Sequence, residues 1–282
     1  MANKDPLMIT DKDEMRKWSR SMRAQGKTIG LVPTMGYLHE GHLSLIQESH
    51  RQTQLTVVSI YVNPGQFSPT EDLSTYPSDF LGDIQKLKSF PGGVDVVFNP
   101  KICMIMGIMI VGVGWGWIKK GVRPVFFRGV ATIVTKLFNI VEPDVAVFGK
   151  KDYQQWRIIK RMVRDLDFGI KVIGTELVRD DDGLAKSSRN VRLSPVDRQK
   201  ALSISKSLFK AKFAAENGQY DCQELRNAVI QAIHEAGGKI DYAEIVDQES
   251  LEKLGEIKRP AVFCVAAWFG NVRLIDNIEI SV

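Results

Sequence analysis

The chain has 282 residues, 44% of them hydrophobic and 25% charged, with a formal net charge of +5 at pH 7. This length suits one large or two ordinary domains, and the composition is that of a soluble globular protein. Three widely spaced cysteines form no disulfide framework, which favours a reducing compartment. The positive charge suits an anionic partner, either nucleic acid or a small phosphate or carboxylate ligand.

The first residues show no targeting signal. The segment Met1–Pro6 lacks the apolar core of a secretory signal and the Arg-rich pattern of a transit peptide, so we expect a cytoplasmic protein. The segment Ile102–Ile118 contains no charge but is at the short limit for a membrane helix and holds four glycines. We therefore expect no membrane span.

Helical and strand-like segments alternate through the first two thirds of the chain. Helices are predicted at 11–25, from Leu43 onward, and at 79–90, 129–141 and 151–166; strands are predicted at 28–33, 55–62, 94–98, 144–148 and 170–174. The strands are apolar throughout, which is typical of a parallel sheet covered on both faces. The predicted fold class is α/β, with a Rossmann-like parallel sheet.

The character of the chain changes near Arg179, in a polar loop. Helices are predicted at 195–217 and 222–236, and strands at 240–246, 261–269 and 272–280, the last two joined by a hairpin turn at Gly270–Asn271. We therefore predict two domains: residues 1–177 form the Rossmann-like domain, and residues 178–282 form a second, smaller α+β domain.

Two of the four histidines lie where the first long strand becomes a helix. His39 and His42 are three residues apart and can face the same way. The N–H groups and positive dipole end of a new helix favour anions, and imidazole adds further donors. This pattern predicts a nucleotide-phosphate site. A metal pair or two solvated cap residues are the alternatives, and no other His or Cys has zinc-ligand spacing.

A second charged segment, Lys150–Gln155, follows the strand at 144–148. Asp152 with Gln155 fits a capping box, which leaves the two lysines for another role. A lysine pair beside a helix N-terminus is suited to a polyphosphate.

Hydroxyls and cations also gather in the loop between the predicted domains. Lys186, Ser187, Ser188 and Arg189 fit either a solvated linker or a mobile flap that grips phosphates. Asp83, with Asp79 nearby, is a candidate carboxylate for magnesium, although surface carboxylates are common. No serine, cysteine or lysine has an adjacent base, so a protein nucleophile is not expected.

The motifs of the chain resemble those of the pantothenate synthetase (pantoate–β-alanine ligase) family. The resemblance covers nearly the whole chain and rests on ordered motifs, with the segment 123–130 similar to plant members. These motifs are Pro33–His42, Val62–Phe67, Phe148–Gln155, Gly183–Asn190 and Arg273–Asn277.

The resemblance implies a homodimeric, cytoplasmic enzyme of the nucleotidylyltransferase superfamily that uses ATP and Mg²⁺. Pantoate would attack the α-phosphate of ATP to give pantoyl adenylate and pyrophosphate. The amine of β-alanine would then displace AMP. Orientation and charge neutralisation are what such a reaction needs from the protein.

The same resemblance implies roles for individual residues. His39 and His42 would contact the ATP phosphates and stabilise the transition state, and Asp83 would occupy a position linked to the metal. The implied nucleotide contacts are Met35, Gly149, Lys151, Asp152, Val178, Lys186, Ser187, Ser188 and Arg189, of which Lys151, Ser187, Ser188 and Arg189 are also catalytic candidates. The implied pantoate contacts are Met35, Asn63, Gln66 and Gln155.

Three departures from the family pattern and two alternative functions stay open. Lys186 stands where methionine is usual, Phe126 replaces a histidine of bacterial members, and residues 101–120 do not follow the pattern. One alternative is an adenylyltransferase for a phosphorylated acceptor, which the neutral pair Gln66 and Gln155 disfavours. The other is an RNA-binding module, but no exposed aromatics are seen interleaved with basic residues. No nucleic-acid partner is expected.

Overall fold

The computed structural model describes residues 5–67, 72–101 and 124–281. The uncharged segment 102–118 and most of the divergent stretch 101–120 lie outside the described residues. The chain divides into two compact units: Met1–Lys150 with Gln155–Thr175, and Lys151–Gln154 with Glu176–Val282. None of the helices in the described part of the chain is long and apolar enough to cross a membrane.

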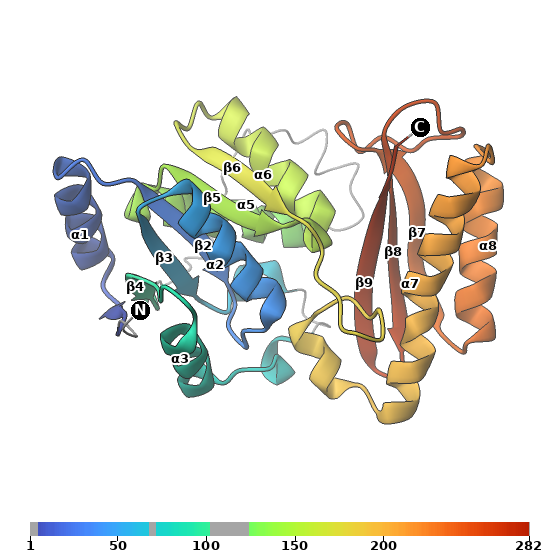
Figure 1. Ribbon diagram of the computed structural model, residues 1–282, viewed down its shortest axis with the longest axis horizontal. Helices are drawn as coiled ribbons and strands as arrows, with labels where there is room; N and C mark the ends of the chain where they lie inside the picture. Colours follow the sequence, from blue (N-terminus) through green and yellow to red (C-terminus); the bar gives the residue numbers. More distant parts are fainter. Residues whose placement is uncertain (1–4, 68–71, 102–123, 282) are drawn as a thin grey trace. The chain divides into compact units, whose positions relative to one another are not determined.

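The first unit is built on a six-stranded parallel sheet (Figure 1). Every neighbouring pair is parallel, as the uniformly apolar strands predicted. In spatial order the strands are β1 (Leu7–Ile9), β4 (Val96–Phe98), β3 (Leu55–Ile60), β2 (Ile29–Thr34), β5 (Val145–Gly149) and β6 (Lys171–Thr175).

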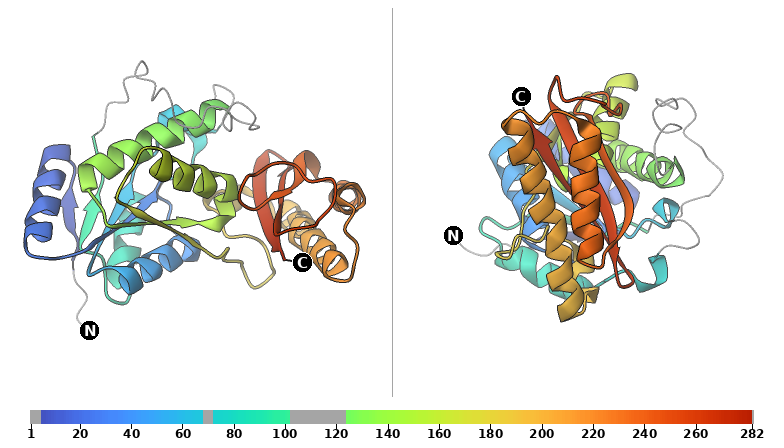
Figure 2. Two further views of the ribbon diagram at one scale, coloured as in Figure 1. Left: turned by 90° about the horizontal axis from the view of Figure 1, so that it is seen from above. Right: turned by 90° about the vertical axis from the view of Figure 1, so that its right-hand side faces the viewer.

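Helices cover both faces of this sheet, as Figure 2 shows. The helices α2 (Glu40–Gln52) and α3 (Phe80–Ser89) bury Leu45, Ile46 and Leu87 against one face. The helices α5 (Pro124–Val141) and α6 (Tyr153–Asp165) cover the opposite face. A further helix, α1 (Lys12–Ala24), begins after its N-cap residue Asp11. Short 3₁₀ turns are η1 (Pro64–Gln66), η2 (Leu73–Thr75) and η3 (Lys150–Asp152).

The direction of the strand order reverses beside β2. From β2 the chain continues outward to β3 and then β4, whereas β5, on the other side of β2, is followed outward by β6. In an open parallel sheet, ligands bind beyond the carboxyl ends of the strands at such a reversal. The loops that follow β2 and β5 are therefore the expected binding loops of this unit.

Two elements of the first unit differ from the prediction. The strand β1 was not predicted, because it has only three residues and both Leu7 and Met8 are exposed, so no buried apolar run marks it. The helix α5 begins at Pro124 and not at residue 129. A proline in the first helical turn is favourable, since its missing N–H would have no intrahelical partner there.

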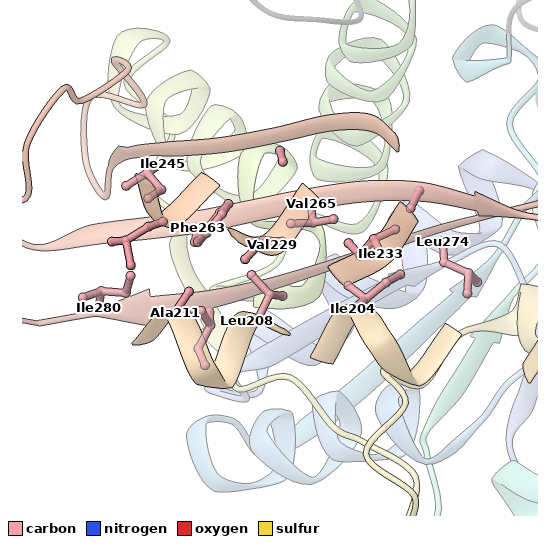
Figure 3. Packing of buried hydrophobic residues seen from close by; sticks show 14 of the residues in the cluster. Ile204, Leu208, Ala211, Val229, Ile233, Ile245, Phe263, Val265, Leu274 and Ile280 are labelled. Atoms are coloured by element: carbon pink, nitrogen blue, oxygen red, sulfur yellow. The ribbon is translucent and has the colours of Figure 1, made fainter. Parts of the chain in front are cut away.

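The second unit packs two helices on an antiparallel three-stranded sheet (Figure 3). The elements are η4 (Ser188–Arg192), α7 (Pro195–Glu216), α8 (Cys222–Glu235), β7 (Lys239–Asp247), β8 (Ala261–Phe269) and β9 (Val272–Ile280). The core between helices and sheet includes Leu208, Val229 and Phe263, all at most 1% exposed. The predicted hairpin is confirmed, with Phe269 paired to Val272 and Gly270 at φ 55°.

The segment Lys151–Gln154 groups with the second unit through contacts to β9. The Asn277 side-chain amide donates to the carbonyl oxygen of Lys151 at 2.9 Å, and the Tyr153 hydroxyl donates to Glu279 at 3.0 Å. The predicted domain limits, 1–177 and 178–282, stay a prediction about folding units.

Candidate functional site

The loop after β2 turns sharply before the two histidines. Gly36 has φ 84° and Tyr37 has φ 52°, so two successive residues adopt the left-handed region. Glycine reaches this region without strain, whereas tyrosine does so only where other contacts hold it. The turn delivers His39 to the N-cap position of α2, where the backbone N–H groups of the helix have no partner within the helix itself.

His39 and His42 form a reciprocal cap of α2. The Nδ1 atom of His39 accepts the N–H of Gly41 at 3.1 Å, and the Nδ1 atom of His42 accepts the N–H of His39 at 3.3 Å. The ring centroids are 4.1 Å apart. A ring nitrogen that accepts an N–H carries no proton, so each neutral ring has its own N–H donor at Nε2. The cap thus fixes the tautomer of both neutral rings.

Two side chains of α3 hold the loop that precedes these histidines. The carboxylate of Asp83, which is 1% exposed, accepts the N–H of Tyr37 at 2.8 Å and the N–H of Leu38 at 2.6 Å. The Lys86 ammonium donates to the carbonyl oxygen of Leu38 at 2.7 Å. Burial raises the pKa of Asp83 above its ordinary value, more than the two N–H donors and Lys86 lower it.

A network of neutral amides lies at the loop after β3. The Asn63 side-chain amide donates to Gln66 Oε1 at 3.0 Å and to the carbonyl oxygen of Gly129 at 3.1 Å. Gln66 Nε2 in turn donates to the sulfur of Met35 at 3.2 Å. Asn63 and Gln66 are buried, so three of the predicted pantoate residues lie together in one connected group.

The remaining predicted residues of this region follow β5. Gly149 ends β5, and Gln155 lies in the first turn of α6, both half-buried. Lys151 and Asp152 belong to the second unit, where their charged groups are 3.8 Å apart. Since β5 is the parallel neighbour of β2, the loops that begin at Gly149 and at Met35 leave the same edge of the sheet.

The residues of the second unit that are predicted to bind phosphate lie in a turn held by hydrogen bonds. The Lys186 N–H donates to the carbonyl oxygen of Val178 at 2.9 Å, beside an isolated antiparallel bridge between Arg179 and Ala185. Ser187 caps η4 by accepting the N–H of Arg189 at 3.2 Å, and Ser188 is buried. These bonds keep the four residues from Lys186 to Arg189 in one compact turn. Closure of this turn as a flap stays a prediction.

Lys186, the unusual cation of this turn, makes an ion pair with Asp180. Arg198 also donates to Asp180, at 2.8 Å. Burial alone would raise the pKa of Asp180, but the hydrogen bonds from Lys186 and Arg198 outweigh it and hold the pKa below its ordinary value. The lowered pKa means that Asp180 stabilises the folded chain above the unfolded pKa and loses this contribution as pH falls through the folded one.

Replacing Lys186 by methionine is expected to lower the free energy of unfolding at pH 7 by about 0.5–1 kcal/mol, because Asp180 loses one donor. The loss should narrow as the pH falls from 7 to about 3, because protonation of Asp180 weakens its pair with Lys186 in the unsubstituted protein, whereas the variant has no such pair to lose. Thermal unfolding at the two pH values measures this, with Lys206→Met on the exposed side of α7 as the charge-matched control. Equal losses at both pH values would contradict the ion-pair explanation.

Among the described residues there is no cluster of side chains that would hold a metal ion by itself. No three His, Cys, Asp or Glu side chains gather there as metal ligands would. Asp83, the residue predicted to lie near a metal, is buried, and each of its carboxylate oxygens accepts a backbone N–H group. These two hydrogen bonds fit a residue that holds a loop in place. We assign no step of a reaction to a metal bound by Asp83.

Sequence reasoning missed two residues that shape this region. Lys86 lies three positions after Asp83, on the same face of α3, and this spacing is a usable signal for a paired role. Gly129 accepts from Asn63 across a helix–loop contact, and no local pattern marks it.

Comparison with known proteins places the chain in a family. The model of the pantoate-beta-alanine ligase family matches residues 7–279. The pantoate–beta-alanine ligase of Lotus japonicus is 65% identical over 98% of this chain and 99% of its own length, and that of Arabidopsis thaliana is 61% identical over 99% of both.

Solved structures agree with these sequence matches. The crystal structure of pantothenate synthetase from Thermus thermophilus superposes with a TM-score of 0.87, at 38% identity over 98% of this chain and all of that one. The Francisella tularensis pantoate-beta-alanine ligase, solved with beta-gamma ATP and beta-alanine, has a TM-score of 0.78 at 33% identity, covering 97% of each chain. The chain therefore belongs to the pantoate–β-alanine ligase family.

Proposed function

We propose that this ligase condenses pantoate with β-alanine through a pantoyl adenylate, consuming ATP and releasing pyrophosphate and AMP. The observation that carries the proposal is the reciprocal cap of His39 and His42 at the strand-order reversal. It supplies two imidazole N–H donors at a helix N-terminus, the environment that favours a phosphate whose charge increases during reaction.

The first chemical step needs no nucleophile from the protein. A pantoate carboxylate oxygen forms a bond to the α-phosphorus of ATP as the bond to the pyrophosphate oxygen breaks. The Nε2 donors of His39 and His42 stabilise negative charge on the phosphate oxygens. We assign the other contacts to ATP to Gly149, Lys151, Asp152, Val178, Lys186, Ser187, Ser188 and Arg189. In this assignment the cations and hydroxyls contact the phosphates, and Asp152 contacts the ribose.

We assign the binding of pantoate to uncharged side-chain amides. Asn63, Gln66 and Gln155 offer uncharged donors and acceptors, which suit the hydroxyls of pantoate, while Met35 contributes an apolar wall. In the second step the β-alanine amine attacks the acyl carbon, the bond to AMP breaks, and the amine loses a proton. The beta-gamma ATP and beta-alanine in the Francisella relative support the assignment of ATP and β-alanine as substrates.

The partners and location implied by the resemblance belong to the proposal as well. We assign the chain a homodimeric state and a cytoplasmic location, with ATP, pantoate and β-alanine as its ligands and no nucleic-acid or membrane partner. Mg²⁺ would enter with the ATP phosphates and neutralise their charge when bound. A native mass of one chain, or tight salt-dependent binding of random RNA, would contradict these assignments.

The reaction sequence can be tested by the order in which products appear. Purified protein with ATP, Mg²⁺ and pantoate should release pyrophosphate, and AMP should appear only after β-alanine is added. A coupled pyrophosphate assay and chromatography of nucleotides measure the two products. AMP release before β-alanine, or no pyrophosphate that depends on pantoate, would refute the adenylate route. Omission of pantoate is the control.

A further inference from the structure

The helix α5 approaches η1 at a distance that only glycine permits. A Cβ atom on Gly129 would lie 1.9 Å from the carbonyl oxygen of Gly65, 2.3 Å from its carbonyl carbon and 2.7 Å from the backbone nitrogen of Gln66. All three contacts are with backbone atoms, so no side-chain rotation can relieve them. A side chain at position 129 therefore has to push η1 and α5 apart.

Local conformation does not explain this glycine. Gly129 lies inside α5 and is not among the residues with positive φ, so an alanine could adopt the same backbone. Glycine is also the poorest helix former after proline, which makes it unfavourable at this position by itself. The close contact with η1 is thus the physical reason that remains for a glycine here.

The residue that makes this close contact is also tied to the amide network. The carbonyl oxygen of Gly129 accepts from Asn63 Nδ2, and the same nitrogen donates to Gln66 Oε1. Asn63 Oδ1 further accepts the N–H of Gly65 at 3.2 Å. The contact between α5 and η1 therefore fixes both the position of the loop and the orientation of its two amides.

We propose that Gly129 is a positioning residue for acid recognition: it lets α5 hold η1 so that Asn63 and Gln66 are set before the acid arrives. This inference rests on the proposed function, since it takes pantoate as the ligand of these amides. Preorganised polar groups lower the cost of binding because their side chains are already ordered.

The substitution Gly129→Ala tests the proposal. A displacement of η1 by about 1 Å can cost on the order of 100-fold, so pantoate KM should rise by that order without a comparable change in ATP KM. Gly30→Ala is a control for crowding in the same unit outside the amide network: a Cβ there would meet the side-chain oxygen of Ser49 at 2.2 Å, which can move aside, so both KM values should stay unchanged. A purely structural role predicts that Gly129→Ala loses stability and kcat while the pantoate KM rises no more than the ATP KM, and this result would overturn the proposal.

A second measurement keeps the inference testable if the variant does not fold. In the unsubstituted protein, NMR should show slow exchange of the side-chain amide protons of Asn63 and Gln66 before any acid is added. Fast exchange of both amides would overturn the proposal. If the unsubstituted protein shows slow exchange but no pantoate-dependent pyrophosphate, the proposed function fails while the positioning of the amides stands.

Discussion

Replacing His42 by asparagine is expected to lower the rate of pantoate-dependent pyrophosphate release by about 100- to 1000-fold, the usual effect of losing one donor to a developing charge. The thermal unfolding midpoint should change little. Asparagine Oδ1 can take the place of Nδ1 and accept the N–H of His39, so the cap is kept. Only the Nε2 donor is lost, which separates the chemical role of the ring from its structural role.

The substitution His42→Gln is the complementary control. A glutamine amide nitrogen reaches towards the position of Nε2, but the acceptor at Nδ1 is missing. This variant should keep more activity than His42→Asn and lose about 0.5–2 kcal/mol of stability, the typical cost of a lost helix cap. If His42→Asn is fully active while His42→Gln is destabilised, the histidine serves as a cap only, and the phosphate assignment is wrong.

The parallel sheet could be predicted because its strands carry their own signal. Runs such as Leu31–Val32 and Val57–Val58 are apolar on successive residues and fully buried, as a strand covered on both faces must be. The strand β1 has no such signal, because its pairing with β4 is an edge contact that leaves Leu7 and Met8 exposed. Burial pattern therefore sets the limit of what the sequence reveals about this fold.

Residues of the site could be predicted only where residue type and spacing indicate the chemistry by themselves. His39 and His42 stand out by residue type and spacing, and the prediction that they lie at a strand-to-helix junction is confirmed. The partners of Asp83 are backbone N–H groups of a loop distant in the chain, and those of Gly129 are backbone atoms of another loop. Backbone partners leave no residue pattern, so these roles become visible only in three dimensions.

The substitution Asp83→Ala is expected to lower the free energy of unfolding by about 2–5 kcal/mol, since it leaves the buried N–H groups of Tyr37 and Leu38 without their acceptor. Tyr37 would also lose the contact that holds its left-handed conformation, so the turn before His39 should relax. Adenylation should therefore slow together with the loss of stability. Urea unfolding and the pyrophosphate assay measure the two effects.

The matched variant Asp83→Asn distinguishes loop holding from a role in metal binding. Asparagine keeps one acceptor, but its amide nitrogen faces the second N–H group. About half of the loss of stability seen in Asp83→Ala should therefore persist. The Mg²⁺ dependence of the rate should stay that of the unsubstituted protein. A metal ligand would behave in the opposite way: the Mg²⁺ concentration for half-maximal rate would rise sharply and stability would hardly change. Because each carboxylate oxygen accepts a buried backbone N–H group of the loop, the geometry supports the first outcome.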